Sequence, residues 1–131
     1  MPGETDLATL LASLDPVLDA REFGYATVPH GTPLPAGFRP WGLFHEDEGL
    51  TLIAPASELA AAGIEALAGL ARLTMMVQSS LEAVGMTAAM ATALTRAGIS
   101  ANVVAAYHHD HIFVPWNRRE EAVAVLAALA D

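Results

Sequence analysis

The chain has 131 residues, of which 53% are apolar and 16% are charged. This length is typical of one domain, or of two very small domains that share a core, and the composition excludes an intrinsically disordered chain. The formal net charge is −9 and all six basic residues are arginines, so the sequence lacks the basic patch that nucleic acid binding requires. The absence of cysteine excludes disulfides and thiol chemistry.

Membrane and export signals are also missing from the sequence. No uncharged segment approaches the roughly 20 residues that a membrane-spanning helix needs. The N-terminal segment MPGETDLATL has neither the basic nor the apolar part of a signal peptide. We therefore expect a cytoplasmic protein that does not interact with membranes.

The first half of the chain predicts a helix, a strand, a loop and a hairpin in turn. Residues 6–15 place four leucines at helical spacing, and residues 23–29 are typical of a strand. A loop rich in proline and glycine follows. Two apolar segments then flank the acidic turn at residues 45–49, which indicates a β-hairpin. Residues 56–69 favour a helix that Gly63 weakens.

The centre of the chain predicts a strand followed by a capped helix. Alternation at residues 72–78 indicates the strand. The segment Ser79–Glu82 fits the S-x-x-E capping box, in which the serine and the glutamate bond to free N–H groups of the first turn. The helix is expected to end at Ala97, where Gly98 supplies a left-handed stop. Because it carries only two charges, little of its surface is expected to face water.

The remaining residues predict two strands and a final helix. Residues 99–107 and 112–115 form the strands, and Asn117 is the expected N-cap of the helix. The apolar stripe of that helix is expected to comprise Ala122, Val125, Leu126 and Leu129. The resulting order, β-α-β-β-α, is one strand short of a ferredoxin-like unit. The missing strand is expected from residues 23–29 or from a second copy of the chain.

Four segments together resemble small bacterial ACT-domain proteins. SSLEAVGMTAA, AGISANVV and AYHHDHIFVP are similar to the C-terminal half of these proteins, and FHEDEGLTLIAP is similar to the first half. The resemblance covers most of residues 22–115. It extends more remotely to the tandem-ACT arginine sensors, which share a comparable strand, a serine-rich helix start and a G-I-S strand.

The resemblance implies an α+β fold, a ferredoxin-like sandwich of the βαββαβ type. It implies two tandem ACT-like modules, residues 1–69 and 70–131, interlocked in one body. In the relatives an amino acid or similar metabolite lies near the start of the first helix and the strand after it. Carried over to this sequence, the implied ligand-binding residues are Ser79, Ser80, Leu81, Glu82, Gly98, Ile99, Asn102 and Val103.

The predicted helix start also has a physical reason to bind a ligand. Its free N–H groups and the positive end of the helix dipole would hold a carboxylate, each dipole contact contributing roughly 0.3–1 kcal/mol. The alternative is that Ser79 and Glu82 only satisfy one another as a capping box. Asn102 leaves a similar choice open, since its amide would bond either to a ligand or to a neighbouring loop.

The histidine-rich segment allows a metal or acid–base interpretation. His109, Asp110 and His111 are residue types of zinc sites and of hydrolases, but side chains around a hairpin turn diverge, and no H-x-x-x-H helix brings them to one face. A polar hairpin near the surface is the simpler interpretation. The chain also lacks a nucleophile elbow, a phosphate loop and a dinucleotide fingerprint.

We therefore expect a regulatory protein that binds a small molecule, most simply an amino acid, and that forms a homodimer or a higher homo-oligomer. It is expected to have no catalytic residues, no metal and no cofactor, and to bind neither nucleic acid nor membranes. Two alternatives stay open at this point. One is a structural oligomerisation module without a ligand, and the other is a small metal-dependent or hydrolytic enzyme that uses His109, Asp110 and His111.

Overall fold

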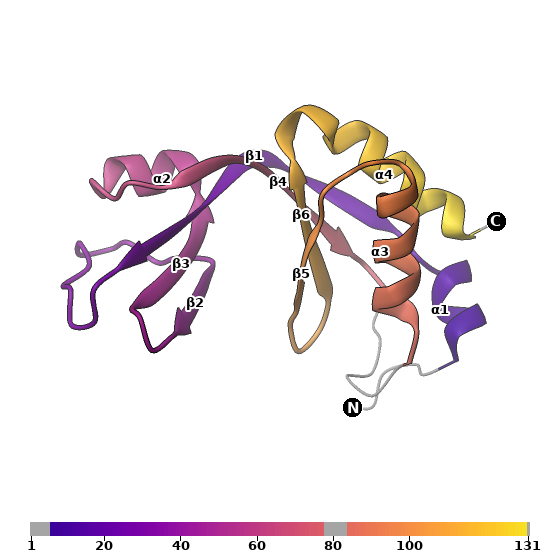
Figure 1. Ribbon diagram of the computed structural model, residues 1–131, viewed down its shortest axis with the longest axis horizontal. Coiled ribbons are helices and arrows are strands. Elements are labelled where there is room, and N and C mark those ends of the chain that lie inside the picture. The colour runs from indigo at the N-terminus through magenta and orange to yellow at the C-terminus, as the bar shows by residue number, and fades with distance from the viewer. Residues whose placement is uncertain (1–5, 78–83, 131) are drawn as a thin grey trace. The chain divides into compact units, whose positions relative to one another are not determined.

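The structure is a computed structural model that describes residues 6–77 and 84–130 (Figure 1). In chain order, its main elements are α1 (Leu7–Ala12), β1 (Pro16–Val28), β2 (Gly42–His45), β3 (Leu50–Pro55), α2 (Ala56–Ala61), β4 (Leu67–Met75), α3 (Met86–Arg96), β5 (Asn102–Ala105), β6 (Asp110–Pro115) and α4 (Arg119–Ala127). Short 3₁₀ turns flank α4 at Trp116–Arg118 and Ala128–Ala130. Within these described ranges, no helix is long and apolar enough to cross a membrane.

The chain forms two compact units. The central unit is residues 21–70, and the terminal unit combines residues 1–20 with residues 71–131. Strands β1 and β4 each contribute one end to the central unit and the other end to the terminal unit. The two units therefore share two strands. The central unit is one continuous segment of the sequence, whereas the terminal unit combines both ends of the chain.

The strand order is the same in both units. The central unit has the order β2-β3-β1-β4, and the terminal unit has β5-β6-β4-β1. The strands of the terminal unit can be numbered from β4, with β1 as the fourth. The order within the six-stranded sheet is then second, third, first, fourth in both units. The ferredoxin-like fold is confirmed. The strand that the second half lacks comes from the same chain.

That borrowed strand lies earlier in the sequence than predicted. The predicted strand began at residue 23, whereas β1 begins at Pro16 and its first five residues belong to the terminal unit. Charged residues interrupt the apolar pattern here, so the period-2 signal was weak. Asp19 nevertheless lies within the sheet because its carboxylate accepts a hydrogen bond of 2.7 Å from Arg72 of β4.

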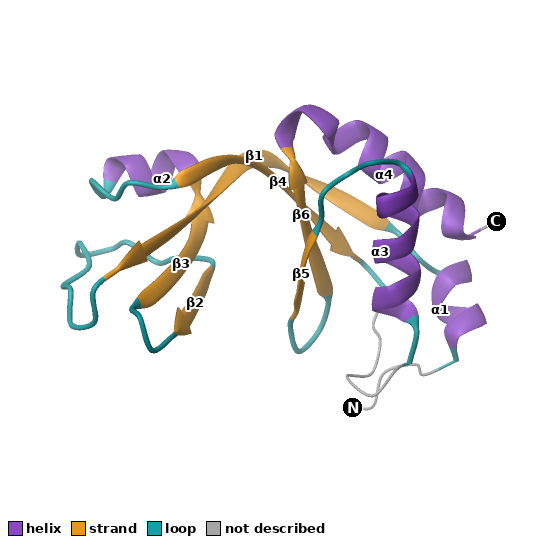
Figure 2. Ribbon diagram, viewed as in Figure 1, coloured by secondary structure: helices purple, strands orange, loops and turns teal. Residues whose placement is uncertain are grey.

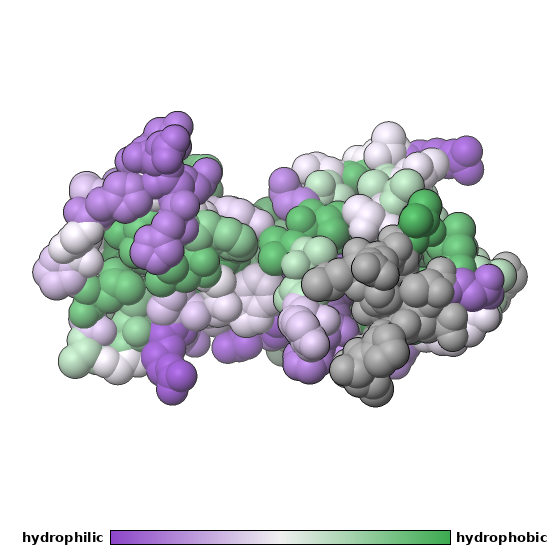
Figure 3. Space-filling view, turned by 90° about the horizontal axis from the view of Figure 1, so that it is seen from below, coloured by the Kyte–Doolittle hydropathy of each residue, from purple (hydrophilic) through white to green (hydrophobic). Residues whose placement is uncertain are grey.

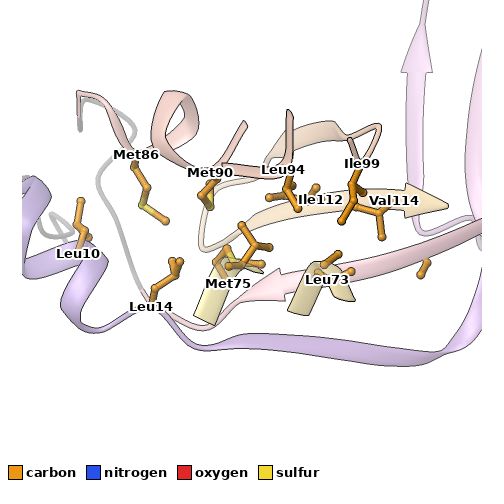
Figure 4. Close-up of a cluster of buried hydrophobic side chains, with 13 residues drawn as sticks. Leu10, Leu14, Leu73, Met75, Met86, Met90, Leu94, Ile99, Ile112 and Val114 are labelled. Carbon is orange, nitrogen blue, oxygen red and sulfur yellow. The ribbon is translucent and has the colours of Figure 1, made fainter. Parts of the chain in front are cut away.

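The core of the terminal unit lies between its sheet and three helices. Helices α1, α3 and α4 gather on one face of the sheet (Figure 2). Apolar side chains from these helices and from β4 and β6 point toward one another there (Figure 4). The buried members are Leu10, Leu14, Ala71, Leu73, Met75, Met86, Met90, Leu94, Ile99, Ile112, Val114, Ala122 and Leu126.

The central unit is built on two antiparallel pairings. Strand β1 pairs with β3 from Phe23 opposite Pro55 to Val28 opposite Leu50. Strand β2 pairs with β3 around the predicted acidic turn, which confirms the hairpin. The small core of this unit contains Ala26, Leu52, Ala54 and Leu59, packed against partly buried residues of the loop after β1 and of the segment after α2.

Several predicted boundaries are wrong for identifiable reasons. Helix α2 ends at Ala61 because the chain turns at Gly63, which has φ +73°. The final helix is not capped by Asn117, which lies in a 3₁₀ turn before α4. The apolar stripe of α4 is only partly confirmed, since Ala122 and Leu126 are buried whereas Val125 and Leu129 are half-buried.

Candidate functional site

The first predicted ligand segment, Ser79–Glu82, lies outside the described residues. The helix that was expected to begin there begins at Met86. Gly85 precedes it with φ +94°, a left-handed conformation that glycine adopts readily. The described part of the predicted helix over residues 80–97 is therefore helical from Met86 to Arg96, and residues 80–83 lie outside the described residues.

Gly98 and Ile99 follow the end of α3 and are held by the terminal unit itself. Gly98 has φ +72°, as predicted for a left-handed stop, and the Ile99 N–H donates to the carbonyl of Leu94 at 2.9 Å. The guanidinium of Arg118 donates to the carbonyls of Ala97 at 3.0 Å and of Gly98 at 3.4 Å. These contacts satisfy carbonyls that a helix end leaves without partners.

The side chain of Ile99 points into the core of the terminal unit (Figure 4) and is 3% exposed. A ligand at this position would therefore meet its backbone rather than its side chain. The sequence signal for this burial was the alternation of apolar residues after Gly98.

Asn102 and Val103 begin the edge strand β5. Asn102 lies opposite Phe113 of β6 and is exposed, whereas Val103 lies opposite Ile112 and packs against the core. Neighbouring residues of a strand face opposite sides of the sheet. Asn102 therefore lies on the face away from the helices, and its amide is accessible to solvent.

The histidine-rich segment forms the tip of the β5–β6 hairpin. Tyr107 and His108 are exposed, whereas Asp110 and His111 are each only 8% exposed. His111 Nδ1 lies 2.9 Å from Thr74 Oγ1 of β4, within hydrogen-bonding distance. His109 is half-buried, and its Nδ1 has no hydrogen-bond partner.

The electrostatics of this hairpin favour neutral groups. Burial, the positive charge of Arg72 and the neighbouring His109 together lower the pKa of the His111 imidazole to about 4. Burial raises the pKa of Asp110, an effect that His109 opposes. At neutral pH, His111 is therefore an uncharged member of the sheet.

Asp19, Arg72, Thr74 and His111 form a polar row on the sheet face opposite the helices of the terminal unit. Their neighbours along the strands, such as Leu73 and Ile112, point into the core, so alternation places the row on the other face. The row includes an ion pair between Asp19 and Arg72 and a hydrogen bond between Thr74 and His111. These interactions can order the strands, and the described residues of the row do not form a set of nucleophile, base and orienting acid.

No group of three or more His, Cys, Asp or Glu side chains in the described part of the chain has the geometry to hold a metal ion. His109 and His111 are separated by one residue, and their interactions differ: His111 lies against Thr74, whereas the buried ring nitrogen of His109 has no hydrogen-bond partner. The hairpin therefore contains the residue types of a zinc site, but their side chains do not point to a common position.

A groove that the sequence did not suggest lies in the central unit. It has a volume of about 480 Å³ and lies between one end of β1 and the segment that leads into β4. Its lining residues are Tyr25, Ala26, Thr27, Thr51, Glu65, Ala66 and Leu67. The sequence contained no signal for it because the groove depends on where β4 begins, five residues before the predicted strand.

The repeated four-stranded α+β units define a tandem ferredoxin-like fold. A family model described as an ACT domain matches residues 2–71, and a second ACT-domain model matches residues 71–128. The chain belongs to the ACT-domain family. No curated protein matches this sequence.

Solved structures share this fold over nearly the whole chain. A Vibrio cholerae protein of unknown function, described as a possible transport protein, is 40% identical over 95% of this chain and 96% of its own, with a TM-score of 0.80. An Agrobacterium tumefaciens protein is 18% identical over 89% of both chains, with a TM-score of 0.73. The ligand-free regulatory subunit of aspartate kinase from Thermus thermophilus is 13% identical over 92% of this chain and 99% of its own, with a TM-score of 0.66.

ACT domains are regulatory, non-catalytic modules that typically bind small ligands such as amino acids, and they often oligomerise. The family assignment therefore confirms the resemblance noted in the sequence.

Proposed function

We propose that this protein is a cytoplasmic sensor that binds an amino acid and works as a homodimer or higher homo-oligomer, without catalysing a reaction. The observation that carries the proposal is the pair of ACT domains, which spans residues 2–128 and contains no further domain within that range. We expect the ligand to act by stabilising one conformation of the paired ACT domains over others.

We assign the ligand to the eight residues that the family resemblance implies: Ser79, Ser80, Leu81, Glu82, Gly98, Ile99, Asn102 and Val103. The accessible amide of Asn102 supports the assignment, because it can donate to a carboxylate or accept from an amino group. Arg118 already donates hydrogen bonds to the carbonyls of Ala97 and Gly98. We therefore expect the ligand to bond to other backbone groups of this segment.

A thermal-shift screen with each of the twenty amino acids at millimolar concentration tests the proposal. A ligand that binds only the folded state stabilises it by mass action, about 2.7 kcal/mol at a hundredfold excess over Kd. At least one amino acid should raise the melting temperature. If none does, the chain is better explained as an oligomerisation module that has lost its ligand.

Two variants locate the site. Ser80→Phe should abolish the shift while leaving the oligomeric state unchanged by light scattering. Ser57→Phe is the matched control, because Ser57 is an exposed serine of α2 in the central unit. A shift that persists in the Ser80 variant and disappears in the control would place the ligand elsewhere.

A further inference from the structure

Strand β1 has an edge that β4 covers only in part. Strand β4 begins at Leu67, and at this point it lies against Gly24: a side-chain Cβ on Gly24 would come within 3.2 Å of the Leu67 carbonyl oxygen. Beyond Gly24, β1 continues to Val28. Among the residues that the structure describes, this end of β1 borders the groove, on the side away from β3, rather than another strand of the central unit.

A strand edge of this kind is a template for another strand. Backbone N–H and C=O groups alternate between the two sides of a strand, so part of those at Ala26–Val28 faces away from β3 and toward the groove. Natural proteins usually protect such edges with charges, prolines or a covering loop. Here the groove leaves space of about 480 Å³ beside the edge.

The groove combines one carboxylate, three hydroxyl-bearing side chains and an apolar wall. Glu65 supplies the carboxylate, and Leu67 is 80% exposed at the wall. Thr27 and Thr51 are direct cross-strand neighbours, and the hydroxyl of Thr51 donates to Glu46, which brings a second carboxylate next to the lining. Figure 3 shows apolar surface on the central unit with hydrophilic residues beside it.

We propose that this groove binds an extended, basic peptide segment of another protein, which adds a strand to the edge of β1 at Ala26–Val28. Main-chain hydrogen bonds to β1 would supply affinity, as in other complexes formed by strand addition. Glu65 and Glu46 would pair with arginine or lysine side chains of the peptide, and Leu67 would cover an apolar one. This binding is independent of the proposed amino-acid ligand.

Charge selects a basic partner over a second copy of this chain. The chain has a formal net charge of −9, and Glu65 and Glu46 lie at the groove, so a second copy of this acidic chain is a poor partner at this particular surface. A basic segment is attracted to the same surface. The segment must also be extended, because only a strand presents its backbone groups at the spacing of the β1 edge.

Fluorescence anisotropy with a labelled peptide, Arg-Thr-Val-Thr-Val-Thr-Arg, tests the proposal on the full-length protein. The wild-type protein should bind this probe, with an affinity that falls as salt is added because the charges are exposed. The same peptide methylated on alternate backbone nitrogens should not bind, since it cannot form the strand pairing. Equal binding of both peptides would overturn the proposal.

Matched charge reversals locate the binding surface. Glu65→Lys should lower the affinity for the labelled peptide about tenfold. Glu120→Lys, an equal change of charge at an exposed position of the terminal unit, should leave this affinity unchanged. Both residues are exposed, so neither change should unfold the protein. An equal loss in the two variants would mean nonspecific charge attraction, and displacement of the peptide by free arginine at millimolar concentration would identify a small-molecule site instead.

Discussion

His111 shows how one buried side chain can link stability to pH. Its imidazole lies against Thr74 and close to the charge of Arg72, in a sheet where a second positive charge is unfavourable. The neutral form satisfies Thr74 without adding a charge. The same residue that seemed to offer acid–base chemistry in the sequence is thus a structural member of the sheet.

Acidification should destabilise the protein through this residue. Burial lowers the pKa of the His111 imidazole to about 4 in the folded protein, from the ordinary value of 6.5 that applies when the chain is unfolded. Between these values the unfolded state binds about one more proton, so the free energy of unfolding falls by about 1.4 kcal/mol per pH unit as pH decreases. Urea unfolding at several pH values from 4.5 to 7 measures this slope.

The variant His111→Gln separates this effect from other titrations. Glutamine can still bond to Thr74 but does not titrate, so its stability should change less over the same pH range. Asp110 opposes the trend in both proteins, because burial raises its pKa and acid therefore favours its folded form. Identical slopes for the wild type and the variant would show that His111 is not the group responsible.

Helix α3 illustrates what an element's sequence can and cannot predict. The lack of charge suggested a helix buried on most sides, yet only Met86, Met90 and Leu94 are buried, and the opposite face is exposed alanine and threonine. Small uncharged residues are compatible with solvent, so the absence of charge does not imply burial. The spacing of the large residues was the reliable signal.

The same contrast holds for the strands and for the candidate site. Local patterns predicted the β2–β3 and β5–β6 hairpins, because each pairs neighbouring segments around a turn. The start of β1 was missed because the partner that stabilises Asp19 is Arg72, far away in sequence. The groove was missed for the same reason, since it lies between Tyr25–Thr27 and Glu65–Leu67, which only the folded sheet brings together.

Truncating Met90 tests which face of α3 carries the packing. Met90 is fully buried among side chains of the terminal core, so Met90→Ala should lower the free energy of unfolding by about 2–5 kcal/mol. Thr92→Ala, two residues further along on the exposed side, should change it by less than about 0.5 kcal/mol. Chemical denaturation of both variants gives the comparison, and similar losses would contradict the assignment of the buried face.

At the scale of the whole molecule, the terminal unit depends on the first twenty residues. Helix α1 places Leu10 in its core, the segment after α1 adds Leu14, and β1 is the sheet neighbour of β4. The Met76 N–H donates to the Asp15 carbonyl at 2.9 Å, and Asp19 pairs with Arg72. The central unit, in contrast, is contained in residues 21–70.

Cutting the chain between Leu70 and Ala71 should therefore affect the two units differently. The fragment 71–131 lacks α1 and the fourth strand of its sheet, so we expect it to be largely unfolded alone, because about 60 residues bury too little apolar surface when part of the core is missing. Adding the fragment 1–70 should restore folding, seen as a far-UV circular dichroism spectrum that exceeds the sum of the two separate spectra. The fragment 21–70 is the control, since it contains the central unit but not the missing strand, and it should restore nothing. A fragment 71–131 that unfolds cooperatively by itself would show that β1 adds to a unit already complete.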